Sequence, residues 1–191
     1  MAADQAVTSA HSFNPTILRS YDIRGQVGKT LSVRDAFFIG AAFGHMTGAK
    51  NAASGPAKIA VGRDGRLTSP ECAAALIDGL VFSGCQVIDI GVGPTPMLYF
   101  ADRYLNCDGA IQVTGSHNPP DHNGFKLVQA HISFFGEDIQ KLGAASAAGI
   151  KAQKGGSQQQ ISVFDAYIER IMEHADFGDA HIIWDAGNGA A

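Results

Sequence analysis

One short segment of this sequence, residues 114–126 (TGSHNPPDHNGFK), gathers side chains that could do chemistry. Ser116 and His117 place a hydroxyl beside an imidazole, and Lys126 adds an ammonium group. Gly115 lets the backbone turn or approach a ligand closely, and the Asn-Pro-Pro-Asp run that follows restricts φ at its two prolines, which stiffens the loop. A lysine binds phosphate as a point charge, and a histidine exchanges a proton near neutral pH. The set points to phosphoryl chemistry.

Residue types alone leave other interpretations of this segment to be weighed. Ser-His pairs and Asn-Pro turns also occur in loops without a catalytic role, so an inert turn stays open. A hydrolytic nucleophile is disfavoured, because the nucleophile elbow needs a glycine two residues before and two after the serine, where this chain has Thr114 and Asn118. A triad histidine directly after its serine would also have unusual geometry.

The composition is that of a globular protein and argues against several kinds of partner. The chain has 191 residues, 46% of them hydrophobic, and a formal net charge of −4. Without a basic surplus or an apolar run long enough to cross a bilayer, neither a nucleic acid nor a membrane is expected as a partner. Cys72, Cys85 and Cys107 lack C-x-x-C spacing, so we interpret them as core thiols in a reducing compartment. With no signal-peptide pattern at the start, the protein is expected to be cytoplasmic.

The apolar pattern predicts alternating strands and helices up to the reactive loop. A helix is expected to begin at Ser32, which forms a capping box with Asp35. A second helix is expected with Ser69 as N-cap and Pro70 at the first helical position. A third helix is expected over 95–105, and short apolar runs predict strands over 58–62, 86–90, 110–113 and 125–128.

These elements predict an α/β fold, a three-layer α/β/α domain with a mixed, mostly parallel sheet. The last two predicted strands are separated by too few residues for a crossover helix, so they should pair antiparallel. Ligands of such sheets collect at the carboxyl ends of the parallel strands. Arg63 and Asp64, the turn over 91–96 and the Ser116 loop all follow strands, and we expect them to meet at one rim.

The remaining third of the chain is expected to lead into a second domain. Helices are predicted over 137–148 and 163–172, and the small, polar residues 149–160 are interpreted as a surface loop or linker. Residues 181–184 (HIIW) are predicted to form a strand before a glycine turn. We therefore expect residues 1–155 to form the first domain, 156–179 an interdomain loop and helix, and 180–191 the first strand of a truncated second domain.

Four stretches of the sequence resemble one enzyme family. Residues 114–126 closely resemble the phosphoserine loop of the α-D-phosphohexomutases, and the PPD-x-NGFK portion favours the phosphomannomutase/phosphoglucomutase branch. Residues 13–25 (FNPTILRSYDIRG) are similar to the family's N-terminal strand and YDIRG motif. Residues 61–66 (VGRDGR) resemble a second family turn, and residues 185–190 (DAGNGA) resemble the start of its second domain.

The resemblance implies a reaction carried by a phosphorylated serine. Ser116 would give its phosphoryl group to a hexose 1- or 6-phosphate of mannose or glucose, and the hexose 1,6-bisphosphate would then return its other phosphate. This bisphosphate is also the expected activator. One oxygen of the phosphate on Ser116 would bind Mg²⁺. Phosphoserine carries a charge of about −1.5 to −2, which cations and a metal must offset.

The resemblance also assigns roles to residues around Ser116. Lys126 and Arg24 would bind substrate, assist proton transfer and stabilise charge, Tyr21 would lie near the substrate, and His117 would flank the phosphate. Behind the loop, supporting roles are expected for Arg63, Asp64 and Asn118.

A complete family member has further domains, and its metal-binding D-G-D-G-D-R loop has no counterpart in this sequence. The remaining Mg²⁺ ligands are therefore expected in the missing second domain. The remaining domains of the same protein are the expected partners, and the chain alone is expected to be inactive. A non-catalytic binding or regulatory module that keeps this fold is the alternative. The sequence does not decide between mannose and glucose phosphates.

Overall fold

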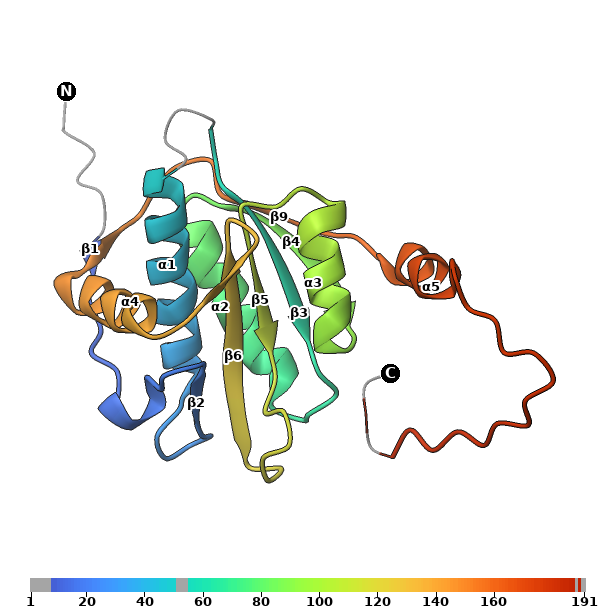
Figure 1. Ribbon diagram of the computed structural model, residues 1–191. Coiled ribbons are helices and arrows are strands. Elements are labelled where there is room, and N and C mark those ends of the chain that lie inside the picture. The colour runs from blue at the N-terminus through green and yellow to red at the C-terminus, as the bar shows by residue number, and fades with distance from the viewer. Residues whose placement is uncertain (1–7, 51–54, 188, 190–191) are drawn as a thin grey trace.

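The computed structural model describes residues 8–50, 55–187 and 189, and its centre is a mixed sheet (Figure 1). The order of strands is β2-β6-β5-β3-β4-β9, and β7 pairs with β6 at one side. Their bounds are β2 Ile23–Gln26, β3 Lys58–Arg63, β4 Gln86–Val92, β5 Gly109–Val113, β6 His122–Gln129, β7 Ile132–Phe134 and β9 Ser157–Gln160. Two short strands, β1 Thr8–Ser9 and β8 Ile150–Lys151, pair separately.

Within this sheet, β6 is the strand that runs against the others. β3 pairs parallel with β4 and β5, and β4 pairs parallel with β9. β6 pairs antiparallel with β5, β2 and β7. The predicted mostly parallel sheet with a returning antiparallel strand is confirmed. The reason is the short connection after β5, which has no room for a crossover helix.

Helices cover both faces of the sheet. Figure 1 shows α1 (Val33–Lys50), α2 (Ser69–Phe82) and α4 (Glu137–Ala148) on one side, and α3 (Thr95–Tyr104) on the other. Alternate strand residues feed two apolar clusters, because successive side chains of a strand point to opposite faces. Ile59, Val61 and Ile111 join the larger cluster, whereas Ala60 and Ala110 join the cluster that contains residues of α3. The predicted three-layer α/β/α domain is confirmed. A short 3₁₀ helix (Pro15–Ile17) and α5 (Phe164–Met172) complete the fold.

The predicted beginning of α1 is confirmed, and that of α2 is shifted by one residue. The hydroxyl and the backbone N–H of Ser32 donate to the Asp35 carboxylate at 2.6 and 2.7 Å, and the Asp35 N–H donates back to the Ser32 hydroxyl at 3.2 Å. At α2 the N-cap is Thr68, and Ser69 is the first helical residue. The Ser69 hydroxyl is therefore free to bond elsewhere, and it donates to Asp64 at 2.5 Å.

The prediction of a surface loop or linker over 149–160 is wrong, because this segment contains β8 and β9. Every side chain of β9 is exposed, so its polar composition gave no sign of a strand. Backbone pairing creates it: the Ser157 N–H donates to the Cys85 carbonyl at 3.0 Å, and the Ile161 N–H to the Asp89 carbonyl at 3.0 Å. The sheet thus continues beyond residue 155, the expected end of the first domain.

The prediction of a strand over 181–184 is also wrong. These residues take no strand conformation and are exposed, because a strand needs a hydrogen-bonded neighbour and this segment runs away from the sheet (Figure 1). Residues 188, 190 and 191 of the predicted second-domain turn lie outside the described residues. The division into domains stays a prediction. No helix of the described chain is long and apolar enough to span a membrane.

The contact of α1 with α2 yields a stability prediction. A Cβ at Gly79 would stand 1.9 Å from the Phe37 carbonyl oxygen, so the two helices touch backbone to backbone there. We expect Gly79→Ala to lower the free energy of unfolding by about 1–3 kcal/mol or more through overpacking. The control is Gly48→Ala in α1, where a Cβ meets nothing within 4 Å. There the better helix propensity of alanine should raise the free energy of unfolding by about 0.5–1 kcal/mol. Urea unfolding measures the free energy for both variants, and equal changes would contradict the close contact of α1 with α2 at Gly79.

The three cysteines are free and buried, which predicts inert thiols. Burial is the main cause that raises the pKa of Cys72, Cys85 and Cys107, each to about 11. At pH 8 only about one such thiol in a thousand is ionised, and the thiolate is the nucleophile. We expect no reaction with Ellman's reagent in the native protein and full reaction in denaturant. A thiol that reacts rapidly before unfolding would contradict this.

Candidate active site

Ser116 lies at the turn of a tight loop between β5 and β6. Its φ is +53°, in the left-handed region that residues other than glycine seldom adopt. Two short-range bonds hold this turn: the Ser116 N–H donates to the Thr114 hydroxyl at 2.9 Å, and the Asn118 side-chain amide donates to the Gly115 carbonyl at 2.8 Å. The Ser116 side chain is exposed, and its Oγ lies 3.4 Å from His117 Nδ1. A hydroxyl is thus presented to solvent by a defined backbone.

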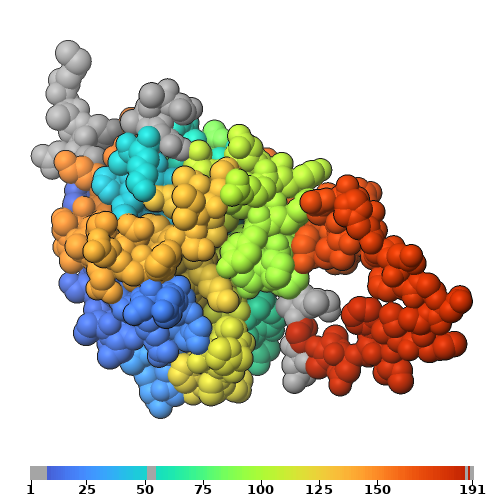
Figure 2. Space-filling view, viewed as in Figure 1, coloured from blue at the N-terminus to red at the C-terminus, as the bar shows by residue number. Residues whose placement is uncertain are grey.

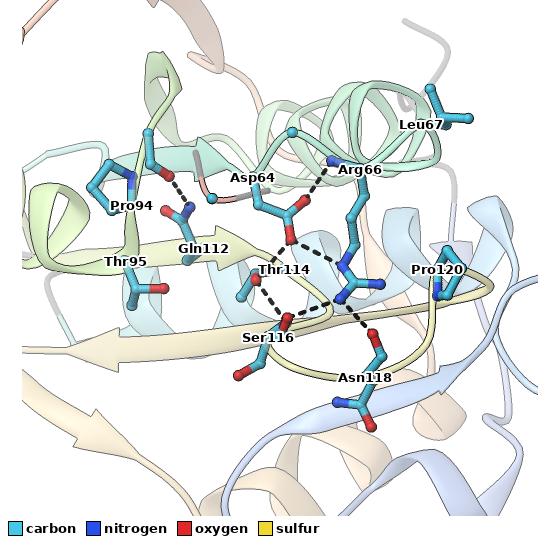
Figure 3. Close-up of a pocket in the computed structure, with 13 residues that line it drawn as sticks. Asp64, Arg66, Leu67, Pro94, Thr95, Gln112, Thr114, Ser116, Asn118 and Pro120 are labelled. Carbon is cyan, nitrogen blue, oxygen red and sulfur yellow. Dashed lines mark hydrogen bonds and ion pairs between the residues drawn. The ribbon is translucent and has the colours of Figure 1, made fainter. Parts of the chain in front are cut away.

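Asp64, directly after β3, is bonded to this loop from behind. One carboxylate oxygen accepts from the Thr114 hydroxyl at 2.9 Å and from the Gly115 N–H at 3.1 Å. The other accepts from the Ser69 hydroxyl at 2.5 Å and from the Arg66 N–H at 3.0 Å. The carboxylate therefore joins the end of β3, the first residue of α2 and the base of the loop. Figure 3 shows its bonds to Thr114 and Arg66.

Arg66 makes more hydrogen bonds to the loop than any of the site residues predicted from the sequence. Its guanidinium donates to four carbonyl oxygens at 2.7–3.1 Å, those of Ser116, Asn118, Pro119 and His122. Its Nε lies 3.2 Å from the Asp64 carboxylate. Figure 3 shows the guanidinium between Asp64 and the loop. The available signal was the resemblance of residues 61–66 to a family turn, which marked the turn but not this arginine.

Arg63, which was expected beside Asp64 in this supporting role, does not make such contacts. Within the part of the chain that the structure describes, its side chain has no hydrogen bond or ion pair, and its backbone carbonyl accepts from the Gly93 N–H at 3.0 Å. Arg63 is the last residue of β3, whereas Arg66 lies beyond the turn, where its side chain reaches the loop. In the described residues it is Arg66, and not Arg63, whose side chain contacts the loop.

Strand pairing brings the two other expected cations to one face of the sheet. Arg24 of β2 is opposite Gly124 of β6, and Lys126 stands two residues further along β6, so both side chains point to the same face. Lys126 is opposite Gln112 of β5. This face is the one that α3 covers, since Ala110 and Val128, two positions away from Gln112 and Lys126, pack in its cluster.

The surroundings of these expected substrate residues differ. Arg24 is paired with Asp22 and half-buried. Lys126 is half-buried, and no acceptor contacts its ammonium group among the described residues. Tyr21 is 84% exposed. Tyr21, Arg24 and Lys126 lie on or beside β2 and β6, and they do not line the cavity next to Ser116.

A cavity of about 600 Å³ lies between the Ser116 loop, the segment before α2 and the start of α3. Ser116, Thr95 and Gln112 are among its lining residues, and Figure 3 shows the hydroxyls of Thr95 and Ser116 both directed into it. The Gln112 side chain is buried and donates to the Gly93 carbonyl at 2.9 Å, so it ties β5 to the turn before α3. Figure 2 shows the loop, coloured yellow, at the surface at the lower end of the molecule.

The donors that the structure describes near Ser116 do not by themselves form the expected Mg²⁺ site. The described residues contain no group of three or more His, Cys, Asp or Glu side chains placed to hold a metal ion. Asp64 is the carboxylate bonded to the base of the loop, and its two oxygens already accept four hydrogen bonds. The described part of the chain thus does not supply a complete set of metal ligands at Ser116.

The chain is similar in sequence to known proteins of one enzyme family. The family description "Phosphoglucomutase/phosphomannomutase, alpha/beta/alpha domain I" matches residues 15–153. The chain is 41% identical to a phosphomannomutase/phosphoglucomutase of Pseudomonas aeruginosa, over 97% of this chain and 40% of the relative. It is 43% identical to a phosphoglucomutase of Neisseria gonorrhoeae, over 93% of this chain and 38% of the relative.

A solved structure from Burkholderia thailandensis, a phosphoglucomutase/phosphomannomutase family protein, superimposes with a TM-score of 0.74 and 41% identity. That superposition covers 85% of this chain and 36% of the other. The chain thus spans about two fifths of the length of the relatives that it matches. With a family match over most of its residues, the chain belongs to the phosphoglucomutase/phosphomannomutase family and contains that family's α/β/α domain I.

Proposed function

We propose that Ser116 carries the phosphoryl group in an enzyme that interconverts hexose 1-phosphates and 6-phosphates. The observation that carries this proposal is one exposed hydroxyl on a loop whose backbone is fixed by Asp64 and Arg66. Phosphoryl transfer requires mainly positioning and charge stabilisation, and a rigid loop provides the positioning. The names of the relatives, phosphomannomutase and phosphoglucomutase, support a mannose or glucose phosphate as the substrate.

The reaction would proceed in two balanced steps. First, a hydroxyl oxygen of the hexose monophosphate forms a bond to the phosphorus on Ser116, the bond from phosphorus to Oγ breaks, and the hydroxyl proton passes to Oγ through the site. The products are a hexose 1,6-bisphosphate and a free serine. Second, the bisphosphate reorients so that its other phosphate faces Ser116. Oγ then takes this phosphoryl group, the proton of Oγ returns to the sugar oxygen, and the isomeric monophosphate leaves. The same bisphosphate would phosphorylate an unmodified serine and so act as activator.

Lys126 and Arg24 would serve this transfer as cations on the same face of the sheet. Lys126 is the better candidate for proton transfer and direct phosphate contact, because no described residue accepts from its ammonium group. Arg24 is already paired with Asp22, which orients its guanidinium and leaves further N–H donors for phosphate oxygens. Tyr21, almost fully exposed beside Arg24, would contact the substrate, and His117 would donate to the phosphate.

An Mg²⁺ ion would neutralise phosphate charge when bound. Ser116 would contribute one phosphate oxygen to it, and the other ligands would come from parts of the protein outside this chain. Those parts would also complete the substrate site, so we expect the 191-residue chain alone to be inactive. They would cover the apolar residues that α5 exposes, Phe164, Ile168, Ile171 and Met172.

We place the reaction in the cytoplasm, which suits three buried, unpaired cysteines.

The phosphoryl carrier can be identified directly in the full-length protein. We expect mass spectrometry of peptides from the purified protein to find phosphate on Ser116. We expect Ser116→Ala to lower hexose phosphate mutase activity by on the order of 10³-fold or more, because the carrier atom is lost. The matched control is Ser133→Ala, at another exposed serine, on β7. Full activity of Ser116→Ala would refute the assignment.

Lys126 offers a separate test, because its charge has no partner in the described structure. We expect Lys126→Met to reduce kcat by about 10²-fold while the melting temperature stays level or rises, since a half-buried unpaired cation does not stabilise the fold. Lys141→Met, at an exposed lysine beside Glu137 and Asp138, should leave kcat unchanged. If Lys126→Met kept full activity, or lost it only by unfolding, Lys126 would have no catalytic part.

A further inference from the structure

The backbone of the Ser116 loop has an orientation that Arg66 imposes. The Ser116 carbonyl points at Arg66 and accepts from its Nη2 at 2.8 Å. A trans peptide unit is planar, with its C=O and N–H directed oppositely. The N–H of His117, in the same peptide unit, therefore points away from Arg66, toward the exposed side of the loop. No described residue accepts a hydrogen bond from it.

Arg66 itself is not available to a phosphate. Its five N–H groups are all directed at the protein, three at loop carbonyls, one at the carbonyl of His122 at the start of β6 and one at Asp64. The guanidinium also lies against the backbone of Gly115, where a Cβ would come within 2.3 Å of the Arg66 Cζ. Gly115 is thus required so that the cation can reach the inside of the loop. This arrangement makes Arg66 part of the loop's interior.

The orientation of these peptide groups favours the binding of an anion on the outer side of the loop. Four carbonyl groups turn their negative ends inward to Arg66, so the positive ends of those peptide units face outward. Backbone N–H groups beside a residue in the left-handed conformation form anion-binding concavities, and Ser116 has a φ of +53°. Pro119 and Pro120 have no N–H, which leaves the His117 amide as the outward donor next to Ser116.

We propose that Arg66 is a positioning residue, which holds Ser116 in its left-handed conformation and turns the His117 N–H toward the phosphoryl group on Ser116. The inference rests on the proposed function in that it takes a phosphoryl group as the ligand. The amide nitrogen is three bonds from the Ser116 Cβ, so it reaches an oxygen of a group attached to Oγ. As a fixed donor it stabilises charge on the group in transfer without reorganising.

The kinetic test uses Arg66→Lys in the full-length protein. Lysine keeps the charge but lacks the planar fork of five donors. We expect kcat to fall by about 10²-fold, because the reacting group is misplaced, while KM changes by less than about twofold. The control is Arg103→Lys in the last turn of α3, where one N–H donates to the His131 carbonyl at 3.2 Å. Equal kcat values for wild type and Arg66→Lys would overturn the proposal.

A spectroscopic test separates positioning from general loss of structure. In protein labelled with ¹⁵N-histidine, the His117 amide proton should shift downfield when Ser116 is phosphorylated, or when inorganic phosphate is added to the unphosphorylated protein. In Arg66→Lys this shift should be lost while the melting temperature stays within a few degrees. An unmoved His117 amide in wild type would overturn the inference. A wild-type protein that shifts with inorganic phosphate but never carries phosphate on Ser116 would overturn the proposed function alone.

Discussion

The ion pair between Asp64 and Arg66 is the contact on which the geometry of the candidate site depends. The Ser116 loop has no regular secondary structure, so its carbonyl groups must accept hydrogen bonds from donors in other parts of the protein. Arg66 donates to three of them and to the carbonyl of His122 at the start of β6, and Asp64 accepts from the base of the loop and aligns Arg66. Charge-assisted bonds of this kind are stronger than neutral ones. They offset the cost of holding a serine at positive φ, which is of order 1–3 kcal/mol.

The register of β6 is the second constraint. Because β6 returns directly after the loop, Lys126 stands opposite Gln112, and Gly124 stands opposite Arg24. Side chains alternate between the faces of a sheet, so a slip of one residue would turn both cations into the opposite cluster. Phe125 and Leu127, which pack there, prevent the slip. The apolar core therefore fixes the face on which the cations of the site appear.

Local patterns predicted those parts of the molecule that local chemistry determines. The capping box of Ser32 and Asp35, the strand alternation and the return of β6 follow from neighbouring residues. The supporting arginine could not be found in this way, because Arg63 and Arg66 share one turn and only the path of that turn decides which reaches the loop. Whether β9 or residues 181–184 form a strand depends on the backbone of a neighbouring strand, and the side chains of these segments do not show whether such a neighbour is present.

The charges around Ser116 indicate what the site still needs. A phosphorylated serine would bring about −1.5 to −2 charges near neutral pH. Arg66 is balanced by Asp64, and Arg24 is balanced by Asp22, so these pairs add no net positive charge. On the face that α3 covers, Lys126 is a cation with no paired carboxylate among the described residues, and it would offset about half of the phosphate charge. On the proposed function, a metal ion or further basic side chains would offset the rest. On the proposed function, the domain would fix the position of the phosphoryl group, and much of its neutralisation would come from the rest of the protein.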